Sequence, residues 1–216
     1  MKHTTRLPGL SIKQNRSKKT YDALIKTGFK LLKKRDFKSL TVAELSRKAG
    51  YSVGAFYARF RSKDEFFDAM VIHHYKTRRK KTNHLFSAYK NDDIIDELIK
   101  DIVQYLWSNR EFWRAALIRS MHDPDFWAPM RKAGHILADK VIVRLSKLAN
   151  RPLTDLEETN VRFAFQITLG TINNSIMNQP GPIFMRQKLF IEKLIRTFRL
   201  VADYDNIIKS SNQANP

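Results

Sequence analysis

The stretch TVAELSRKAGYSVGAFYARFRSKDEFFDAM, residues 41–70, decides the fold of this chain of 216 residues. It predicts two short helices, a tight turn between them, and the start of a third, longer helix. Thr41 and Glu44 have the T-x-x-E spacing of a capping box, so we expect a helix to begin at Thr41. Gly50 is expected to end this helix, because glycine adopts the left-handed conformation without steric cost.

A second helix is predicted directly after the turn. Ser52 can accept hydrogen bonds from the next free backbone amides and so restart a helix. Phe56 and Phe60 lie four residues apart and are expected to share its buried face. Ser62 and Glu65 repeat the capping-box spacing and start the third helix. Two helices joined by a short turn that contains glycine form a helix-turn-helix, whose second helix can enter the major groove of DNA.

The order A-G-Y-S-V-G-A-F-Y-A-R-F-x-S-K within this stretch resembles the tetracycline-repressor (TetR) family of bacterial transcriptional regulators. The resemblance runs from about Leu24 to Met70, with L-I-K-T-G-x-x-L-L-x-x-x-D-F before the motif and S-K-D-E after it. It implies an all-α protein, with an N-terminal three-helix helix-turn-helix domain and a C-terminal helical regulatory and dimerisation domain. The second half of the chain is similar to the family only in length and helical character.

The charge is distributed very unevenly along the chain. The formal net charge is +19; residues 1–90 hold 23 Lys and Arg against 6 Asp and Glu (+17), whereas residues 91–216 hold 17 against 15 (+2). A strongly basic half indicates nucleic acid or an anionic membrane surface as its partner. The helix-turn-helix within that half favours double-stranded DNA.

Periodicity and turn residues divide the chain further. A basic N-terminal arm is expected to be flexible, either reaching into a minor groove beside the major-groove helix or remaining a solvated tail. The first helix is expected to begin at Ser17 or Thr20 and to support the motif. The expected divisions are a flexible arm over 1–16, a helix-turn-helix domain over 17–70 with its motif at about 41–60, a helical effector-binding and dimerisation domain over 71–205, and a tail over 206–216.

The residues expected to face DNA lie off the Phe56 side of the second helix or at helix starts. Small residues let that helix approach closely, and the resemblance implies a phosphate or base-edge contact for Tyr57. Val53 stands where the family usually has a polar residue, so it can offer only apolar contact, such as with a thymine methyl. Lys63, at the start of the third helix, is expected at a phosphate. The candidates are Thr41, Ser52, Val53, Gly54, Ala55, Tyr57, Ala58 and Lys63.

Aromatic residues are dense in the middle of the second half. Each can be ordinary core, but together they can line a mainly apolar cavity with a few polar groups, as small-molecule sites do. The resemblance implies that this domain binds a small effector and that binding moves the third helix, which carries the reading heads. The candidate effector-binding residues are Trp107, Trp113, Trp127, Phe163 and Gln166.

The last two long helices, predicted over 152–178 and 183–203, carry more apolar positions than one buried stripe needs. A homodimer is therefore expected, with two helices from each subunit in a four-helix bundle, which the resemblance also implies. Large apolar interfaces are typical of such obligate dimers. The candidate interface residues are Gly170, Leu194 and Phe198.

Three classes of function remain in view. The leading hypothesis is a sequence-specific transcriptional regulator, a repressor released by a small, largely apolar effector; the alternatives are an effector-independent architectural DNA-binding protein and a helical enzyme. No catalytic motif, membrane span or cysteine is found in the sequence. We therefore expect no catalytic residue and no cofactor. We also expect a cytoplasmic location. His73 and His74 point to different sides of a helix and are expected at the surface, so no metal site is predicted.

Overall fold

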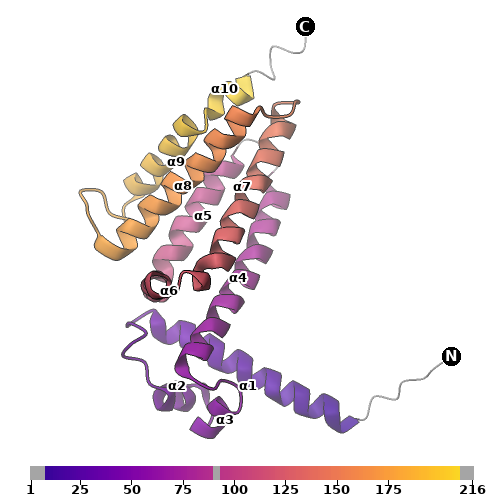
Figure 1. The fold of residues 1–216 in the computed structure, drawn as a ribbon, viewed down its shortest axis with the longest axis vertical. Coiled ribbons are helices and arrows are strands. Elements are labelled where there is room, and N and C mark those ends of the chain that lie inside the picture. The colour runs from indigo at the N-terminus through magenta and orange to yellow at the C-terminus, as the bar shows by residue number, and fades with distance from the viewer. Residues whose placement is uncertain (1–7, 90–92, 210–216) are drawn as a thin grey trace, which may run out of the picture. The chain divides into compact units, whose positions relative to one another are not determined.

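The structure is a computed structural model that describes residues 8–89 and 93–209, with side chains from residue 17 onward. Within these ranges the chain forms helices and no strand, which confirms the predicted all-α fold (Figure 1). The elements are α1 (Pro8–Leu32), α2 (Val42–Ala49), α3 (Val53–Tyr57), α4 (Lys63–Ala88), α5 (Ile94–Ser108), α6 (Arg110–His122), the 3-10 turn η1 (Asp125–Trp127), α7 (Ala128–Leu148), α8 (Asp155–Asn178), α9 (Lys188–Val201) and α10 (Tyr204–Lys209).

The chain divides into two compact units, and the division falls inside α4. One unit ends at Lys76 and the other begins at Thr77. The sequence had placed the boundary after residue 70, near the point where the phenylalanines of the helix-turn-helix core end. A continuous helix carries no turn residue to mark such a boundary, so only the packing of its side chains reveals it.

Helix α1 begins earlier than expected. It starts at Pro8, whereas residues 8–16 were expected to belong to a flexible arm. Proline fits the first turn of a helix, because the N–H that it lacks would have no intrahelical partner there. No glycine or proline interrupts residues 10–27. The rest of the predicted arm and residues 210–216 of the predicted tail lie outside the described residues.

The core of the first unit is built on phenylalanine rings that join α1, α3 and α4. Phe56 and Phe60 are both buried, as predicted, and their ring centroids lie 5.2 Å apart. The Phe56 ring also lies 5.6 Å from that of Phe66 in α4. A Cβ atom at Gly28 in α1 would stand 2.7 Å from Cζ of Phe66, so the close approach of α1 to α4 requires glycine at this position. This core leaves one side of α3 free.

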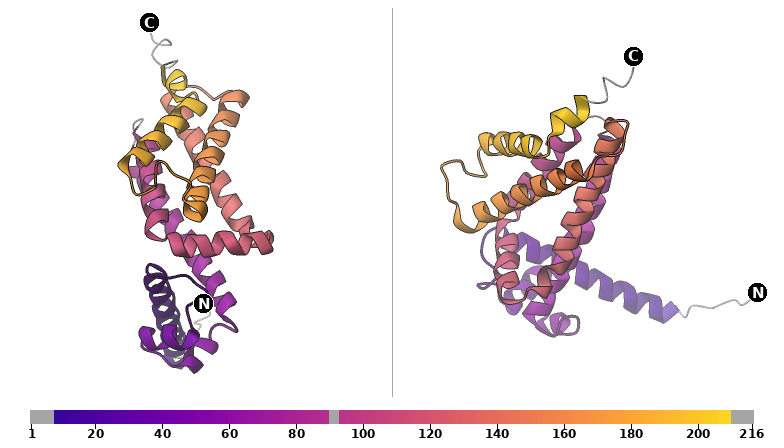
Figure 2. Two further views of the ribbon diagram at one scale, coloured as in Figure 1. Left: turned by 90° about the vertical axis from the view of Figure 1, so that its left-hand side faces the viewer. Right: turned by 45° about the horizontal axis from the view of Figure 1, so that its top comes forward.

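Helix α8 is the central element of the second unit, in contact with α6, α7 and α9. Figures 1 and 2 show α8 and α9 running side by side in opposite directions, joined by the loop over 179–187. The rings of Phe165 in α8 and Phe198 in α9 meet edge to face, with centroids 4.9 Å apart. Arg199 in α9 pairs with Asp96 in α5 at 2.7 Å. These contacts fix the three helices to one another.

The connection from α6 to α7 turns on Asp123. Its carboxylate accepts a hydrogen bond from the N–H of Phe126 at 3.2 Å, and Pro124 is the N-cap of η1. Pro129 lies in the first turn of α7. That position is compatible with proline.

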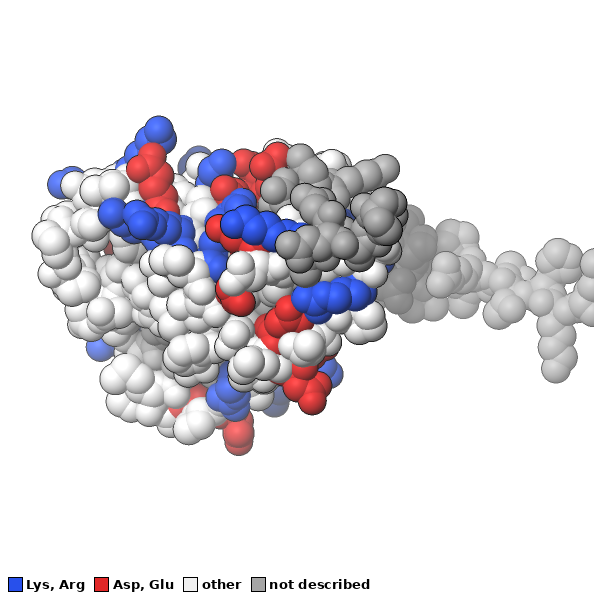
Figure 3. Space-filling view, turned by 90° about the horizontal axis from the view of Figure 1, so that it is seen from above, with Lys and Arg blue, Asp and Glu red and all other residues white. Residues whose placement is uncertain are grey.

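The second unit shows no strongly basic character on the face where α10 lies. Lys, Arg, Asp and Glu side chains are interspersed there (Figure 3), in keeping with the near balance of charge in residues 91–216. Among the described helices, none combines the length and the apolar character that crossing a membrane requires.

Candidate nucleic-acid interface and ligand pocket

Helices α2 and α3 and the turn between them form the helix-turn-helix. The Thr41 side chain accepts a hydrogen bond from the N–H of Glu44 (3.2 Å), and the Ser52 side chain accepts one from the N–H of Ala55 (3.1 Å). Gly50 has φ 80° and ψ 28°, which is the left-handed conformation. Both N-caps and the glycine turn are therefore confirmed.

Each of the two predicted capping boxes forms only one of its two hydrogen bonds, the one that the N-cap hydroxyl accepts. Glu44 does not return to the amide of Thr41; its carboxylate pairs with Arg35 and lies 3.7 Å from the ammonium of Lys48. The hydrogen bond from Arg35 is the main reason that the pKa of Glu44 lies below its ordinary value. Glu65 accepts a hydrogen bond from the N–H of Arg61 at 2.6 Å. Both acids thus tie neighbouring loops to the motif.

Helix α3 presents one face to the core and one to solvent. Phe56 is fully buried, whereas Val53 is 40% exposed and Tyr57 is 53% exposed. A Cβ added at Gly54 would meet only the Ser52 hydroxyl, 3.8 Å away, so a partner can come close to the backbone there. Ser52 and Ala58 are exposed and Ala55 is partly exposed. The candidates on α3 and its two caps therefore share one solvent-facing surface.

Thr41 and Ser52 are already used as caps, but only as acceptors. A hydroxyl group carries one proton to donate as well as lone pairs to accept with. Both residues are exposed. Each can therefore cap its own helix and donate to a phosphate oxygen at the same time.

The ammonium of Lys63 is occupied within its own unit. Nζ donates to the carbonyl oxygens of Lys38 (3.0 Å) and Leu40 (2.8 Å) and lies 4.7 Å from the centre of the Phe37 ring. Partial burial lowers the pKa of Lys63. The side chain expected at a phosphate thus braces the segment that leads into α2, while the first turn of α4 keeps free amides that can face a phosphate.

Two further cations differ in their availability. The Arg59 guanidinium donates to the carbonyl oxygens of Ser17 (3.2 Å) and Ala55 (2.8 Å), so it ties α3 to α1. Arg47 is exposed and pairs with no acidic side chain among the described residues. Arg47 is the better candidate of the two for a backbone contact with DNA.

The five residues proposed for an effector site do not come together in the second unit. Trp113 is buried, stacks edge to face on Trp127 at 5.4 Å and donates from Nε1 to Asn173 at 2.8 Å, which joins α6 to α8. Phe163 is 51% exposed, and Gln166 is exposed on the same helix. These candidates were chosen by residue type, and residue type does not show which face of each helix is turned to the interior of the unit.

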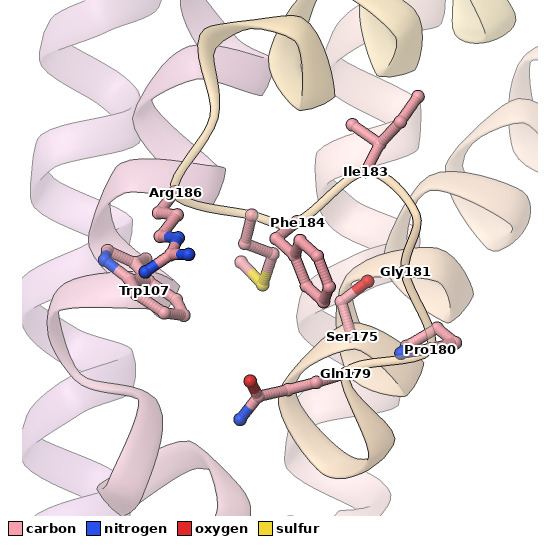
Figure 4. Close-up of a pocket in the computed structure, with 9 residues that line it drawn as sticks. Trp107, Ser175, Gln179, Pro180, Gly181, Ile183, Phe184 and Arg186 are labelled. Carbon is pink, nitrogen blue, oxygen red and sulfur yellow. The ribbon is translucent and has the colours of Figure 1, made fainter.

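Trp107, the fifth residue, lines a pocket of about 260 Å³ between the end of α5, the end of α8 and the loop that follows α8. Figure 4 shows the Arg186 side chain on the Trp107 side of this pocket and the Gln179 side chain extending into it from the end of α8. The lining residues are Trp107, Ser175, Gln179, Pro180, Gly181, Ile183, Phe184, Met185 and Arg186.

The three candidate interface residues also differ in position. Leu194 and Phe198 are buried inside the subunit, at 5% and 0% exposure, so they serve its own core. Gly170 is exposed, and an added Cβ there would find no atom within 4 Å. Several large apolar side chains of α8 and α9 are exposed instead: Leu156, Phe163, Leu189 and Leu200.

The expectation for one of the two neighbouring histidines is wrong. His73 is partly exposed, but His74 is 5% exposed and belongs to the buried side of α4. Among the described residues, no group of His, Asp and Glu side chains is placed to hold a metal ion.

Comparison with known proteins follows this division of the chain. Residues 24–70 match the sequence model described as bacterial regulatory proteins, tetR family. A stretch of 47 residues is 47% identical to YwcC of Bacillus subtilis (strain 168), an uncharacterized HTH-type transcriptional regulator. The match covers 22% of this chain and 21% of YwcC, so it spans about a fifth of each protein.

Solved structures extend the likeness to the whole fold. A protein of Mesorhizobium loti MAFF303099, described as a TetR-family transcriptional regulator, superposes with a TM-score of 0.66 at 15% identity, over 87% of this chain and 95% of that one. Salmonella enterica GusR superposes with a TM-score of 0.58 at 12% identity, over 85% and 95%. Residues 24–70 are therefore similar in sequence to the tetR family, and the fold of the chain is shared by these two solved structures.

Proposed function

We propose, from this family assignment of the helix-turn-helix, that the chain is a sequence-specific DNA-binding transcriptional regulator. The observation that carries the proposal is the two-sided character of α3: Phe56 is fully buried, while Val53 and Tyr57 are 40% and 53% exposed. A capped helix with one free face beside a glycine turn has the form that enters a major groove. The charge of +17 in residues 1–90 supplies attraction to the phosphate backbone.

The proposal gives the exposed residues different roles. Val53 and Ala55 meet base edges, where apolar contact with a thymine methyl is available to them. Tyr57 and the hydroxyls of Thr41 and Ser52 contact phosphates, and contacts of that kind set the register of the protein on the duplex. Lys63 acts indirectly, through the segment before α2 that its ammonium holds.

We further propose that two copies form a homodimer through the exposed faces of α8 and α9. Leu156, Phe163 and Gly170 are spaced seven residues apart and so lie along one side of α8. Leu189 and Leu200 are 45% and 70% exposed on α9. A dimer would cover this apolar surface and present two copies of α3 to successive major grooves.

The regulator is proposed to act as a repressor in the cytoplasm and to leave DNA when a small effector binds the second unit. The pocket beside Trp107 supports the proposal of an effector, because helix ends and a loop enclose a space in which a small molecule can bind. For such a response, the effector must bind one arrangement of the protein more tightly than the other. No catalytic role is proposed for any residue.

The test is a footprint of the chain on DNA upstream of its own gene, with a scrambled duplex of equal length as the control. Protection of a two-fold symmetric site, at a salt concentration where the scrambled duplex is not bound, is expected. Equal binding to both duplexes would leave only charge-driven affinity and would support an architectural protein instead. The variant Val53→Glu, at a solvent-facing position of α3, should remove protection while the fold remains intact.

A further inference from the structure

The pocket beside Trp107 gathers polar groups that the protein itself does not use. The indole N–H of Trp107, the hydroxyl of Ser175, the amide of Gln179 and the guanidinium of Arg186 all belong to its lining, and none makes a hydrogen bond or ion pair with any described residue. Ser175 is 8% exposed as a residue, and it belongs to the lining of this pocket. Polar groups that line a pocket and have no partner in the protein are available to bind a ligand or water.

We infer that this pocket binds a small amphipathic carboxylate, with its anionic end at Arg186 and its apolar part against Trp107 and Phe184. The inference deepens the proposed function, because it names the chemical class of the effector and replaces most of the site expected from sequence. Only its consequence for DNA rests on the proposed function; the binding itself does not.

The polar groups of the lining are mainly hydrogen-bond donors, so they favour a ligand group that accepts hydrogen bonds. Arginine and tryptophan side chains are donors only, and serine and glutamine can also donate. The lining contains no Asp or Glu. The nearest acid along the chain from Trp107, Glu111, is already paired with Arg110 and Arg114, at 3.5 and 3.9 Å. Arg110 adds positive charge, since its guanidinium lies 4.7 Å from the centre of the Trp107 ring. An arginine fork matches a carboxylate in particular, because two parallel hydrogen bonds can form.

The remaining wall is apolar and the space is small. Ile183, Phe184 and Met185 line it, together with Pro180. Its volume of about 260 Å³ is below the ~300–1,000 Å³ of pockets for drug-sized ligands. The occupant is therefore expected to be a compact molecule, such as an arylalkanoic acid, and not a long-chain or multi-ring compound.

The loop that closes the pocket is held in place by its own contacts. The N–H of Phe184 donates to Oε1 of Gln187 (2.8 Å), and the N–H of Gln187 donates back to the carbonyl oxygen of Phe184 (2.9 Å). Gly181 has φ +60°, and a Cβ there would stand 3.0 Å from Cζ of Phe184. Below the loop, Arg114 donates to the carbonyl oxygen of Ile176 at 2.6 Å. The pocket is thus largely preformed, which lowers the cost of ordering it around a ligand.

The test measures binding of phenylacetate to the full-length chain by calorimetry, beside phenylacetamide, which has nearly the same shape and no charge. Benzoate and hexanoate extend the carboxylate series. The variants are Arg186→Gln and Ser175→Ala, with Arg79→Gln as the matched control, since Arg79 is an exposed arginine of the same unit that does not line the pocket. Circular dichroism confirms that each variant is folded.

The expected result is one carboxylate per chain, bound at least about tenfold more tightly than its amide. Arg186→Gln should weaken the carboxylate about tenfold, Ser175→Ala should weaken it several-fold, and Arg79→Gln should leave it unchanged. Equal binding of acid and amide, an Arg186→Gln variant that binds like the wild type, or no binding of any of the three carboxylates at millimolar concentration would each overturn the inference.

A parallel measurement of DNA binding distinguishes a failure of this inference from a failure of the proposed function. If the carboxylate binds at Arg186 but leaves the affinity for the footprinted site unchanged, the pocket stands and the effector part of the proposed function fails. If the chain protects its site but binds no carboxylate, the DNA-binding proposal stands and the present inference fails.

Discussion

The ammonium of Lys63 lies 2.8 Å from the carbonyl oxygen of Leu40, the residue directly before the N-cap of α2. A second bond, to the carbonyl oxygen of Lys38, and the Phe37 ring hold it on this segment. The first residue of α4 therefore fixes where α2 begins. A lysine that stands where a phosphate contact was expected is, by its geometry, a brace inside the domain.

Replacing Lys63 should therefore lower stability more than it lowers the salt dependence of DNA binding. Lys63→Ala is expected to reduce the free energy of unfolding by about 1–2 kcal/mol, because hydrogen bonds that a charged group donates are lost from a partly exposed site. Lys38→Ala, the control, removes an exposed ammonium and keeps the carbonyl, so its effect on stability should be small. The measurements are urea unfolding and DNA binding at several salt concentrations. A slope reduced by about 0.9, with stability unchanged, would instead indicate a direct phosphate contact.

Val53 and Tyr57 should separate base reading from backbone contact. Val53→Ala is expected to change the preference between operator variants by about 1–3 kcal/mol per affected base pair, and to leave the salt slope unchanged. Tyr57→Phe removes a hydroxyl and no charge, so it should weaken binding to all sequences about equally. Binding isotherms on operator and scrambled duplexes check both. A Tyr57→Phe variant that alters only the sequence preference would reverse the two assignments.

The Arg151–Glu157 pair should make stability depend on acid pH. The hydrogen bonds from Arg151, with those of Thr154 at the start of α8, lower the pKa of Glu157 from 4.5 to about 2. A lowered folded pKa contributes stability above about pH 4.5, and this contribution is lost as the pH falls toward 2. Glu157→Gln should therefore cost about 2 kcal/mol at neutral pH, after allowance for the partly exposed Arg151, and progressively less at acid pH.

Unfolding by urea at a series of pH values measures this difference. Glu158→Gln is the control, because Glu158 is 41% exposed and its ion pair with Arg162, at 3.7 Å, is a surface pair. Its effect should be small at every pH. A Glu157→Gln effect that stays constant down to about pH 3 would rule out the linkage.

Two ion pairs in the second unit should contribute differently to the free energy of unfolding. Asp101 pairs with Arg78 and Lys81; burial opposes its ionisation, but the hydrogen bonds from both cations outweigh burial and lower its pKa. Asp101→Asn leaves a largely buried Arg78 short of its partner and should cost about 3 kcal/mol. Asp139→Asn breaks the exposed 2.8 Å pair with Arg162 and should cost less than about 1 kcal/mol. Equal losses in urea unfolding would show that burial does not set the difference.

The dimer should be broken from the exposed face of α8 without loss of the subunit fold. Phe163→Glu places a charge on a side chain that is 51% exposed, so sedimentation should show folded monomers. Leu194→Glu buries a charge in the subunit core and should unfold the second unit. A Cβ added at Gly170 has open space around it, so Gly170→Leu should be tolerated by the subunit and should also weaken the dimer. A Phe163→Glu variant that remains dimeric at micromolar concentration would place the interface elsewhere.

The two N-caps, the glycine turn and the buried phenylalanine pair, each predicted from close spacing along the chain, agree with the structure. The caps at Thr41 and Ser52 act on amides three residues away, and Gly50 needs only its own backbone freedom. Phe56 and Phe60 share a buried side because four residues make about one helical turn. The helix-turn-helix could therefore be predicted, together with the solvent face of α3.

Expectations about contacts between distant residues fared less well. Trp113 and Trp127 pack on one another, whereas Phe163 points to solvent, although all three are aromatic residues of neighbouring helices. Periodicity marks which positions of a helix are apolar, but not which neighbour covers them. For that reason Leu194 and Phe198 were expected at a partner and lie instead in the core of the subunit.

The sequence alone determined the helical fold, the caps and turn of the reading head, and the concentration of positive charge in the first 90 residues, because each depends on a residue and its near neighbours. Tertiary packing decided the partners of Lys63, which lie 23 and 25 residues away, and the pocket that joins Trp107 to Arg186. Such sites require segments far apart in sequence to meet, and that meeting depends on how whole helices pack.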